Sequence, residues 1–169
     1  MKITPEKKEE LENIYKEFLH NEKIQRMKLI PMHRGSNCYI HSFKVAKLAI
    51  KRALRHKKGH LKHILIAAIL HDYYLYDWRV DKEKRKKHLS QHPQIAIDNA
   101  EMDFIIDDRI KEISKTHMWP INIKDFPKTK EARIVTLADK SVAFKEMMTN
   151  KKFKQRREDK YLNSISSLF

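Results

Sequence analysis

The sequence predicts an all-α fold, and three features support that prediction. The 169 residues include only two glycines and five prolines, so residues that form tight turns are scarce. Lys, Glu, Leu, Ile and Ala, which favour helices or pack well within them, are abundant. Apolar residues also recur at intervals of three and four. The length and the hydrophobic content of 41% fit one domain, so we expect residues 1–169 to form a single-domain bundle of about six to seven helices.

The first half of the chain contains three expected helices. The first covers residues 5–28, where apolar side chains recur at helical spacing. The second covers residues 38–56, and its His41 shares an inward side with apolar neighbours. The third covers residues 60–76 and has a mostly apolar sequence. Its apolar run ends at the polar pair His71-Asp72, an unusual way for a buried helix to close.

The second half contains five further segments. Residues 81–87 are expected to form a charged loop or short helix. A helix over residues 90–100 would place His92 at its start, with Pro93 in the first turn. Three more helices, the last of them short and amphipathic, are expected at residues 107–116, 129–148 and 153–166.

Two polar residues of this half occupy positions that favour a site. His117 follows the helix expected at residues 107–116, which must end before Pro120. Asp139 aligns with Val135 and Val142 on the apolar side of its helix. An imidazole and a carboxylate are therefore expected to point inward.

The cysteine content and the hydropathy pattern favour a cytoplasmic protein. Cys38 is the only cysteine, which excludes an internal disulfide and a zinc site built from several thiolates. The longest apolar run, Ile64 to Leu70, is far shorter than the roughly 20 residues that a membrane span needs. The Lys- and Glu-rich N-terminus lacks a signal-peptide core. We expect no membrane association.

The charge of the chain is strongly positive. Thirty-seven basic against 22 acidic residues give a formal net charge of +15. Such a field attracts phosphate-bearing substrates or nucleic acid. The lysines are spread along nearly every expected helix, however, which is typical of solvated faces. Nucleic-acid binding is therefore an alternative, but the pattern does not favour it.

Six histidines and aspartates are expected at helix ends or on inward helix faces: His41, His71, Asp72, His92, His117 and Asp139. Burying so many titratable side chains without partners costs several kcal/mol, roughly, in desolvation. Divalent metal offsets that cost most economically. Imidazole and carboxylate ligands suit Fe, Mn, Zn or Co.

Two neighbouring groups of residues are alternative candidates for functional roles. His88 precedes His92 by four residues and could replace it as a ligand or support it. The aromatic residues Tyr73, Tyr74 and Trp78 could stack on a base, but core packing is the favoured interpretation.

The ordered set resembles the HD superfamily of metal-dependent phosphohydrolases. The matching segments are HSFKVAKLA at 41–49, AAILHD at 67–72, HPQIAIDNA at 92–100 and TLADK at 136–140. The resemblance implies an HD-type helical bundle with a core at about residues 37–146, between an N-terminal helix at 5–28 and a C-terminal helix at 153–166.

The resemblance also implies a metal arrangement. Relatives with two further histidines between the doublet and the final Asp hold two metals, and this chain has both. Carried over, His41, His71, Asp72 and Asp139 bind the first metal, and Asp72 bridges to a second held by His92 and His117. Fe or Mn is expected, and Zn, Co or Ni would also fit.

The function implied is hydrolysis of a small phosphate ester or nucleotide at two metals. Paired metals polarise a phosphoryl group and activate water. Asp72 is the expected catalytic carboxylate, while Lys140 and Arg79 could stabilise phosphate charge. Some relatives with the same six ligands are mixed-valent di-iron oxygenases, which is the main alternative beside a non-catalytic nucleic-acid-binding module. The oligomeric state stays open.

Overall fold

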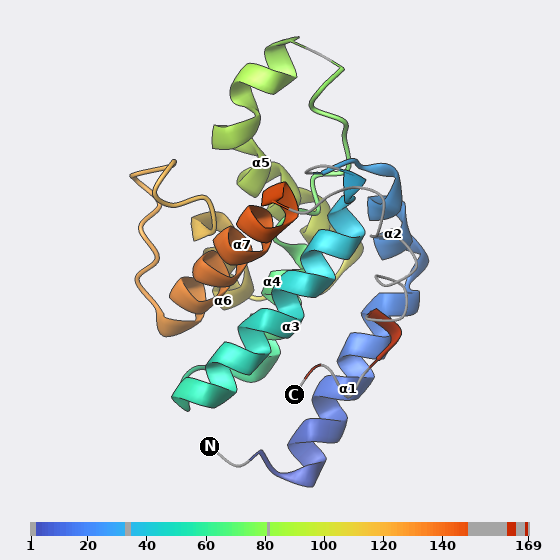
Figure 1. The fold of residues 1–169 in the computed structure, drawn as a ribbon, viewed down its shortest axis with the longest axis vertical. Helices are drawn as coiled ribbons and strands as arrows, with labels where there is room; N and C mark the ends of the chain where they lie inside the picture. Colours follow the sequence, from blue (N-terminus) through green and yellow to red (C-terminus); the bar gives the residue numbers. More distant parts are fainter. Residues whose placement is uncertain (1–2, 33–34, 81, 149–161, 165–167, 169) are drawn as a thin grey trace.

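Figure 1 shows the chain as a bundle of α-helices in a computed structural model. The described residues are 3–32, 35–80, 82–148, 162–164 and 168. This part of the chain contains seven α-helices and no β-strand, and one isolated bridge pairs Pro31 with Asn37. The predicted all-α class is confirmed.

The N-terminal segment, expected as one helix over residues 5–28, is interrupted at Asn21. It forms α1 (Pro5–His20), α2 (Glu22–Gln25) and the 3₁₀ helix η1 (Arg26–Leu29). Asn21 has an extended backbone, and its side chain accepts the N–H groups of Lys23 and Ile24 at 2.9 and 3.3 Å. Such capping satisfies the free donors of a new helix start, which explains why the chain changes direction here.

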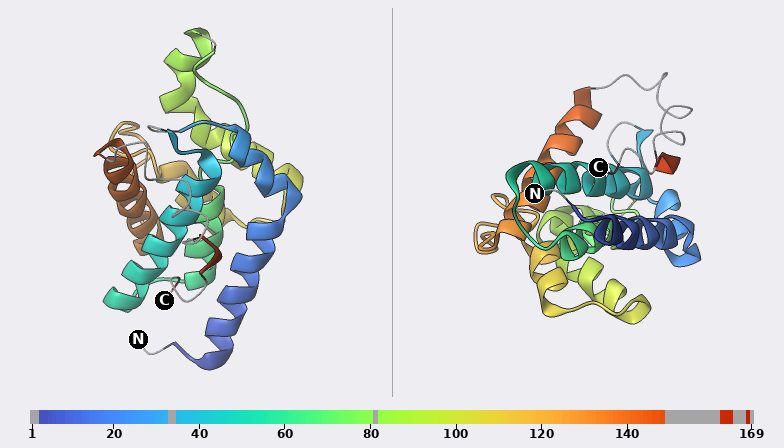
Figure 2. Two further views of the ribbon diagram at one scale, coloured as in Figure 1. Left: turned by 45° about the vertical axis from the view of Figure 1, so that its right-hand side comes forward. Right: turned by 90° about the horizontal axis from the view of Figure 1, so that it is seen from below.

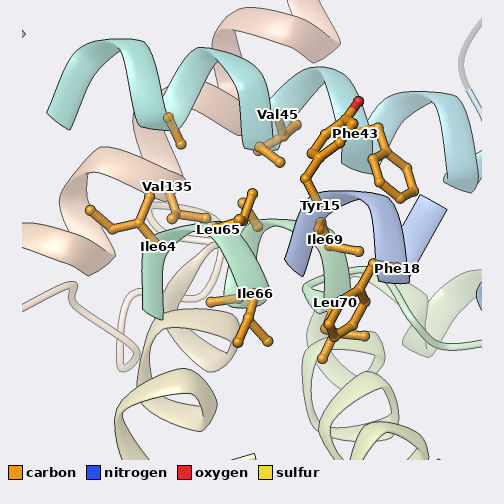
Figure 3. Packing of buried hydrophobic residues seen from close by; sticks show 14 of the residues in the cluster. Tyr15, Phe18, Phe43, Val45, Ile64, Leu65, Ile66, Ile69, Leu70 and Val135 are labelled. Atoms are coloured by element: carbon orange, nitrogen blue, oxygen red, sulfur yellow. The ribbon is translucent and has the colours of Figure 1, made fainter. Parts of the chain in front are cut away.

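The centre of the bundle is α4 (Leu61–Leu70), which packs against α1 and four other helices. These are α3 (Cys38–His56), α5 (Lys82–Asp103), α6 (Asp108–Thr116) and α7 (Lys130–Met148). Eight of the ten residues of α4 are buried. Figure 3 shows α4 below α3, with Tyr15 and Phe18 of α1 near one end of it and Val135 of α7 near the other. Burying one such side chain contributes about 1.5–3 kcal/mol. An apolar sequence on every side of this helix follows from its central place.

The helix α4 ends at Leu70, earlier than the predicted end at residue 76. Leu75 has a φ of +54°, which a right-handed helix does not accommodate. The shorter helix makes His71 its C-cap residue and leaves Asp72 beyond the last turn. Both side chains are therefore at a helix end, as the sequence predicted.

The remaining helices are α5 (Lys82–Asp103), α6 (Asp108–Thr116) and α7 (Lys130–Met148). The last two match their predicted bounds within one residue. The prediction for α5 was wrong, because the helix begins at Lys82 and continues through Pro93. Lys, Glu and Arg in its first turns favour helix, and a proline removes a single ladder hydrogen bond. His92 is therefore an interior residue of a helix.

The arrangement of these helices encloses a polar centre. The helix α3 packs on α4 and α7, and α6 packs on α4, α5 and α7. The two views in Figure 2 show α1 beside α3 and α4, away from α7. Among the described residues, none of the helices has the length and apolar character needed to cross a lipid bilayer.

The helix predicted at residues 153–166 lies outside the described residues, apart from 162–164. Those three residues adjoin the core. The Tyr15 hydroxyl donates to the Leu162 carbonyl at 3.0 Å, and the buried Lys47 ammonium donates to the Ser164 carbonyl at 2.9 Å.

Candidate metal centre

The structure brings the six predicted metal ligands together. His41 lies on α3, His92 on α5 and Asp139 on α7, while His71 and His117 are the C-cap residues of α4 and α6. All six side chains, including that of Asp72, are buried, and Asp139, the most exposed of them, has 6% of its surface accessible to solvent. Five helices that are distant in sequence thus contribute to one polar centre.

Asp72 lies between two groups of imidazoles. Its Oδ2 is 3.2 Å from His71 Nε2 and 3.9 Å from His41 Nε2. Its Oδ1 is 3.3 Å from His92 Nε2 and 3.5 Å from His117 Nε2. Each carboxylate oxygen therefore faces a different pair of histidines, which is the geometry that a bridging ligand requires.

Backbone carbonyls fix the orientation of three of these imidazoles. The Nδ1 atoms contact carbonyl oxygens at 2.9 Å for His71 with Ala68, at 2.7 Å for His92 with His88, and at 2.5 Å for His117 with Ser114. A carbonyl oxygen only accepts hydrogen bonds, so each Nδ1 carries the proton. Each Nε2 therefore presents its lone pair to the centre unless a second proton binds there.

The close approach of several hydrogen-bond acceptors favours binding of a cation at this centre. His92 Nε2 and His117 Nε2 are only 2.9 Å apart, and Asp72 Oδ1 is close to both. His71 Nε2 is buried and makes no hydrogen bond among the described residues. The C-terminal ends of α4 and α6, which carry partial negative charge, also meet here. A proton or a metal ion is needed to relieve this repulsion.

His41 is oriented by a carboxylate instead of a carbonyl. Its Nδ1 lies 3.0 Å from Glu146 Oε2, and its Nε2 lies 3.0 Å from Asp139 Oδ1. Glu146 is 2% exposed, and its Oε1 accepts from Ser36 Oγ at 2.9 Å and from Lys44 Nζ at 3.2 Å. A carboxylate behind a histidine orients the ring and raises its basicity toward metal.

The protonation of the first group follows from these contacts. Burial alone would lower the pKa of His41, but the hydrogen bonds to Asp139 and Glu146 raise it to about 9. Burial is likewise outweighed at His71, whose pKa the charge of Asp72 raises to about 10. Burial would raise the pKa values of Asp72 and Asp139, yet their histidine partners hold both well below the usual range. In the absence of metal, protons on these imidazoles therefore balance the carboxylates.

The second group behaves differently. Burial lowers the pKa of His117 to about 4, so that this ring is neutral at pH 7. Burial has the same effect on His88, whose pKa is also lowered to about 4. Neutral imidazoles with free lone pairs are the form in which histidine binds metal.

The donor set fits divalent metal. Ligand atoms of His41, His71 and Asp139 lie within 4.8 Å of one another, as do those of His71, Asp72 and His117. His71 belongs to both groups, whereas the sequence assigned it to the first metal alone. Nitrogen and carboxylate oxygen donors suit first-row transition metals, and the donor set does not distinguish among them.

A pocket of about 570 Å³ opens over the centre. Asp72, His92, His117 and Asp139 form part of its wall. The two predicted phosphate-binding residues, Lys140 and Arg79, also line it. Lys140 Nζ is 2.9 Å from Asp139 Oδ2, whereas the Arg79 guanidinium forms a two-pronged pair with Asp77 at 3.0 and 2.9 Å. Both cations adjoin the pocket, and the charge of Arg79 is partly offset by its partner.

Three residues near the centre were missed or left undecided by the sequence. Glu146 was missed, although it follows Asp139 by seven residues and so lies on the same side of α7. Arg85 lines the pocket from the part of α5 that was expected to be a charged loop or short helix. His88 supports His92: their rings stack with centroids 4.5 Å apart, and Tyr76 Oη contacts His88 Nδ1 at 3.0 Å.

The single cysteine contacts Tyr74, one of the residues that line the pocket. Cys38 Sγ donates to the hydroxyl of Tyr74 at 3.2 Å, and both residues are buried. Burial raises the pKa of the Cys38 thiol well above its ordinary value. The thiol is therefore protonated at neutral pH.

Comparison with known proteins agrees with this geometry. A family model described as HD domain matches residues 38–143, which is more than half of the chain. No curated protein and no solved structure matches the chain at a significant level. The matched residues contain all six predicted ligand residues, which meet at Asp72. The chain therefore belongs to the HD domain family, whose members are largely metal-dependent phosphohydrolases.

Proposed function

We propose that this protein is a metal-dependent phosphohydrolase that cleaves a small phosphate ester or nucleotide at a two-metal site. The observation that carries the proposal is the position of Asp72, whose two oxygens each face a separate pair of imidazoles. His41, His71, Asp72 and Asp139 would hold one metal. Asp72, His92 and His117 would hold the other.

When bound, a pair of divalent metals supplies Lewis acidity that polarises a phosphoryl group and makes a coordinated water more acidic. The protein supplies the orientation. Asp72 fixes the distance between the two ligand groups, and the carbonyl-bound Nδ1 atoms keep the imidazoles aimed inward. Preorganised ligands of this kind need no rearrangement during the reaction.

Cations at the pocket wall complete the site. Lys140 lies beside Asp139, and Arg79 and Arg85 line the same pocket. Positive charge at this position stabilises the negative charge on the phosphoryl oxygens during transfer. The net charge of +15 would further raise the local concentration of anionic substrates.

The test uses protein loaded with manganese under anaerobic conditions and a panel of phosphate esters. We expect about two metal atoms per chain and hydrolysis that is lost in Asp72→Ala. Anaerobic turnover separates hydrolysis from oxygen-dependent cleavage, the chemistry of an oxygenase. Full hydrolytic activity in metal-free protein would refute the proposal. Oxygen consumption with iron, without hydrolysis under manganese, would replace it with the oxygenase alternative.

A further inference from the structure

The wall of the pocket above the metal centre has an unusual composition. Besides the metal ligands and three cations, its described lining residues are mostly apolar: Met32, Trp78, Leu89, Met118, Ile121 and Met147. No Asn, Gln, Ser, Thr or Glu is among the described lining residues. Apart from the metal ligands and the three cations, the pocket therefore offers mainly apolar surface.

Apart from the metal ligands and the three cations, the polar side chains in the described part of the wall are Tyr74 and His88, and both are engaged within the protein. Tyr74 Oη accepts from Cys38 Sγ and lies 3.2 Å from Met32 Sδ. His88 Nδ1 is bonded to Tyr76 Oη, and its ring stacks against Trp78 with centroids 5.1 Å apart and planes 16° apart. Sugar hydroxyls and the edges of nucleobases need several donors and acceptors. This wall does not present such a set.

Three of the apolar wall residues are exposed to solvent, although apolar side chains are usually buried. Leu89 is 51% exposed, Ile121 is 55% exposed and Met147 is 44% exposed. Leu89 on α5 and Ile121 in the loop after α6 line the same pocket. Methionine adapts its shape to varied apolar groups, and an aromatic ring such as Trp78 offers a flat contact surface. A volume of about 570 Å³ lies in the range of small-molecule sites.

We infer that this pocket selects phosphate monoesters whose organic group is apolar, such as a benzyl or short alkyl group, over esters of sugars and polyols. The phosphate would lie toward Lys140 and the metal ligands. The organic group would lie on Trp78 and between Leu89 and Ile121. The inference rests on the proposed function and narrows its substrate class.

The test compares esters whose leaving groups are all primary alcohols, so that their intrinsic reactivity is similar. Benzyl phosphate and hexyl phosphate are the apolar substrates, and glycerol 3-phosphate and ribose 5-phosphate are the polar ones. With manganese-loaded wild type, we expect kcat/KM to be at least about tenfold higher for the apolar pair, because desolvating even a few methylene groups has an effect of this size. Equal or reversed values would overturn the inference and leave phosphohydrolase activity intact.

Matched variants locate the preference. Leu89→Ser combined with Ile121→Ser should raise KM for benzyl phosphate about tenfold or more, so that kcat/KM for benzyl phosphate falls by about that factor relative to kcat/KM for glycerol 3-phosphate. The control combines Met102→Ser with Ile123→Ser, which alter the same helix and the same loop at positions 75% and 79% exposed and outside the pocket wall. All four residues are exposed, so folding should be preserved. An equal effect of both double variants would contradict the inference.

A binding measurement separates the inference from the proposed function. If no ester is hydrolysed, the proposed function fails, and the affinity of metal-loaded protein for two phosphonates then decides the inference. Calorimetry should show benzylphosphonate binding at least about tenfold more tightly than 2,3-dihydroxypropylphosphonate. Equal affinities would overturn the selection of apolar groups.

Discussion

The described part of the chain contains two clusters of histidines and acids, and they differ in how the side chains are paired. At the metal centre, four imidazoles present Nε2 to shared carboxylates in a buried space. At the other cluster, His63 Nε2 contacts a single acid, Asp107 Oδ2, at 2.9 Å, and the Asp107 side chain is 54% exposed. His60 lies beside His63, and its backbone N–H donates to Glu131 Oε1 at 2.9 Å.

The difference shows that histidines near carboxylates do not by themselves make a metal site. Where one imidazole faces one exposed carboxylate, as in His63 with Asp107, solvent screens the pair, although His63 Nδ1 is buried without a hydrogen-bond partner among the described residues. Where lone pairs outnumber donors in a buried space, charge must be supplied. The following predictions compare the two clusters, from the largest expected effect to the smallest.

The largest effect is expected for His117→Ala, which removes one imidazole from the second ligand group. Metal content should fall from about two atoms to one per chain, and phosphoester hydrolysis should fall by at least about a hundredfold, because the Lewis acidity of one metal contributes several kcal/mol. Metal analysis and kcat together measure this. His63→Ala is the matched control and should change neither. Retention of two metals in His117→Ala would exclude the assignment of the ligands to two metals that share Asp72.

A smaller effect is expected at Glu146, which positions His41 without reaching the pocket wall. Glu146→Gln keeps the shape and removes the charge, and metal affinity should fall by about 10- to 100-fold. Glu146→Ala should weaken binding further. Competition with a chelator reports the affinity. If both variants bind metal like wild type, the carboxylate behind His41 has no role in orienting it.

The pH dependence of metal-free protein should have a maximum near pH 6.5. The folded pKa values of His41 and His71, about 9 and about 10, exceed the ordinary value of 6.5, so their contribution to stability is present below 6.5 and lost as pH rises to 10. The pKa values of His88 and His117 are lowered to about 4, so stability is lost as pH falls from 6.5 to 4.

Thermal unfolding in the presence of a chelator tests this dependence. Adding manganese should weaken the decline above pH 6.5, because bound metal replaces the protons on His41 and His71. A metal-free protein that becomes steadily more stable from pH 6.5 to 10 would contradict the proton balance assigned to the centre.

The smallest effect is expected at the exposed cluster. Asp107 is the N-cap of α6 and accepts the Ile110 N–H at 2.9 Å. Asp107→Ala should lower the free energy of unfolding by about 1 kcal/mol, or about 2–4 °C in Tm, as loss of a cap does. Metal content should not change. Loss of metal in this variant would show that the two clusters are coupled.

The sequence was informative where periodicity and capping agree. The bounds of α3 and α7 follow from apolar spacing, and His117 was correctly placed at a helix end. The convergence of the six ligands was predicted because each lay on an inward face or at a helix end, and the family resemblance ordered them. The match over residues 38–143 confirms the family.

Other features depended on tertiary contacts that no local pattern specifies. Pro93 was expected near a helix start, yet helix-forming residues before it carry α5 through that position. Glu146 looks like one of many charged residues on a Lys- and Glu-rich helix, and only the positions of Ser36, His41 and Lys44 distinguish it. The apolar wall of the pocket joins α5 to the loop after α6, two segments whose proximity the sequence does not reveal.

The burial of Cys38 under Tyr74 also provides a built-in reporter of local opening. Alkylating reagents attack thiolates that they can reach, and this sulfur is neither exposed nor deprotonated while the first turn of α3 stays packed. The rate at which the thiol is modified therefore reports how often that turn separates from the residues around it. His41 lies three residues after Cys38 on the same helix. Labelling rates with and without manganese would therefore measure how much the bound ion stabilises this end of the helix.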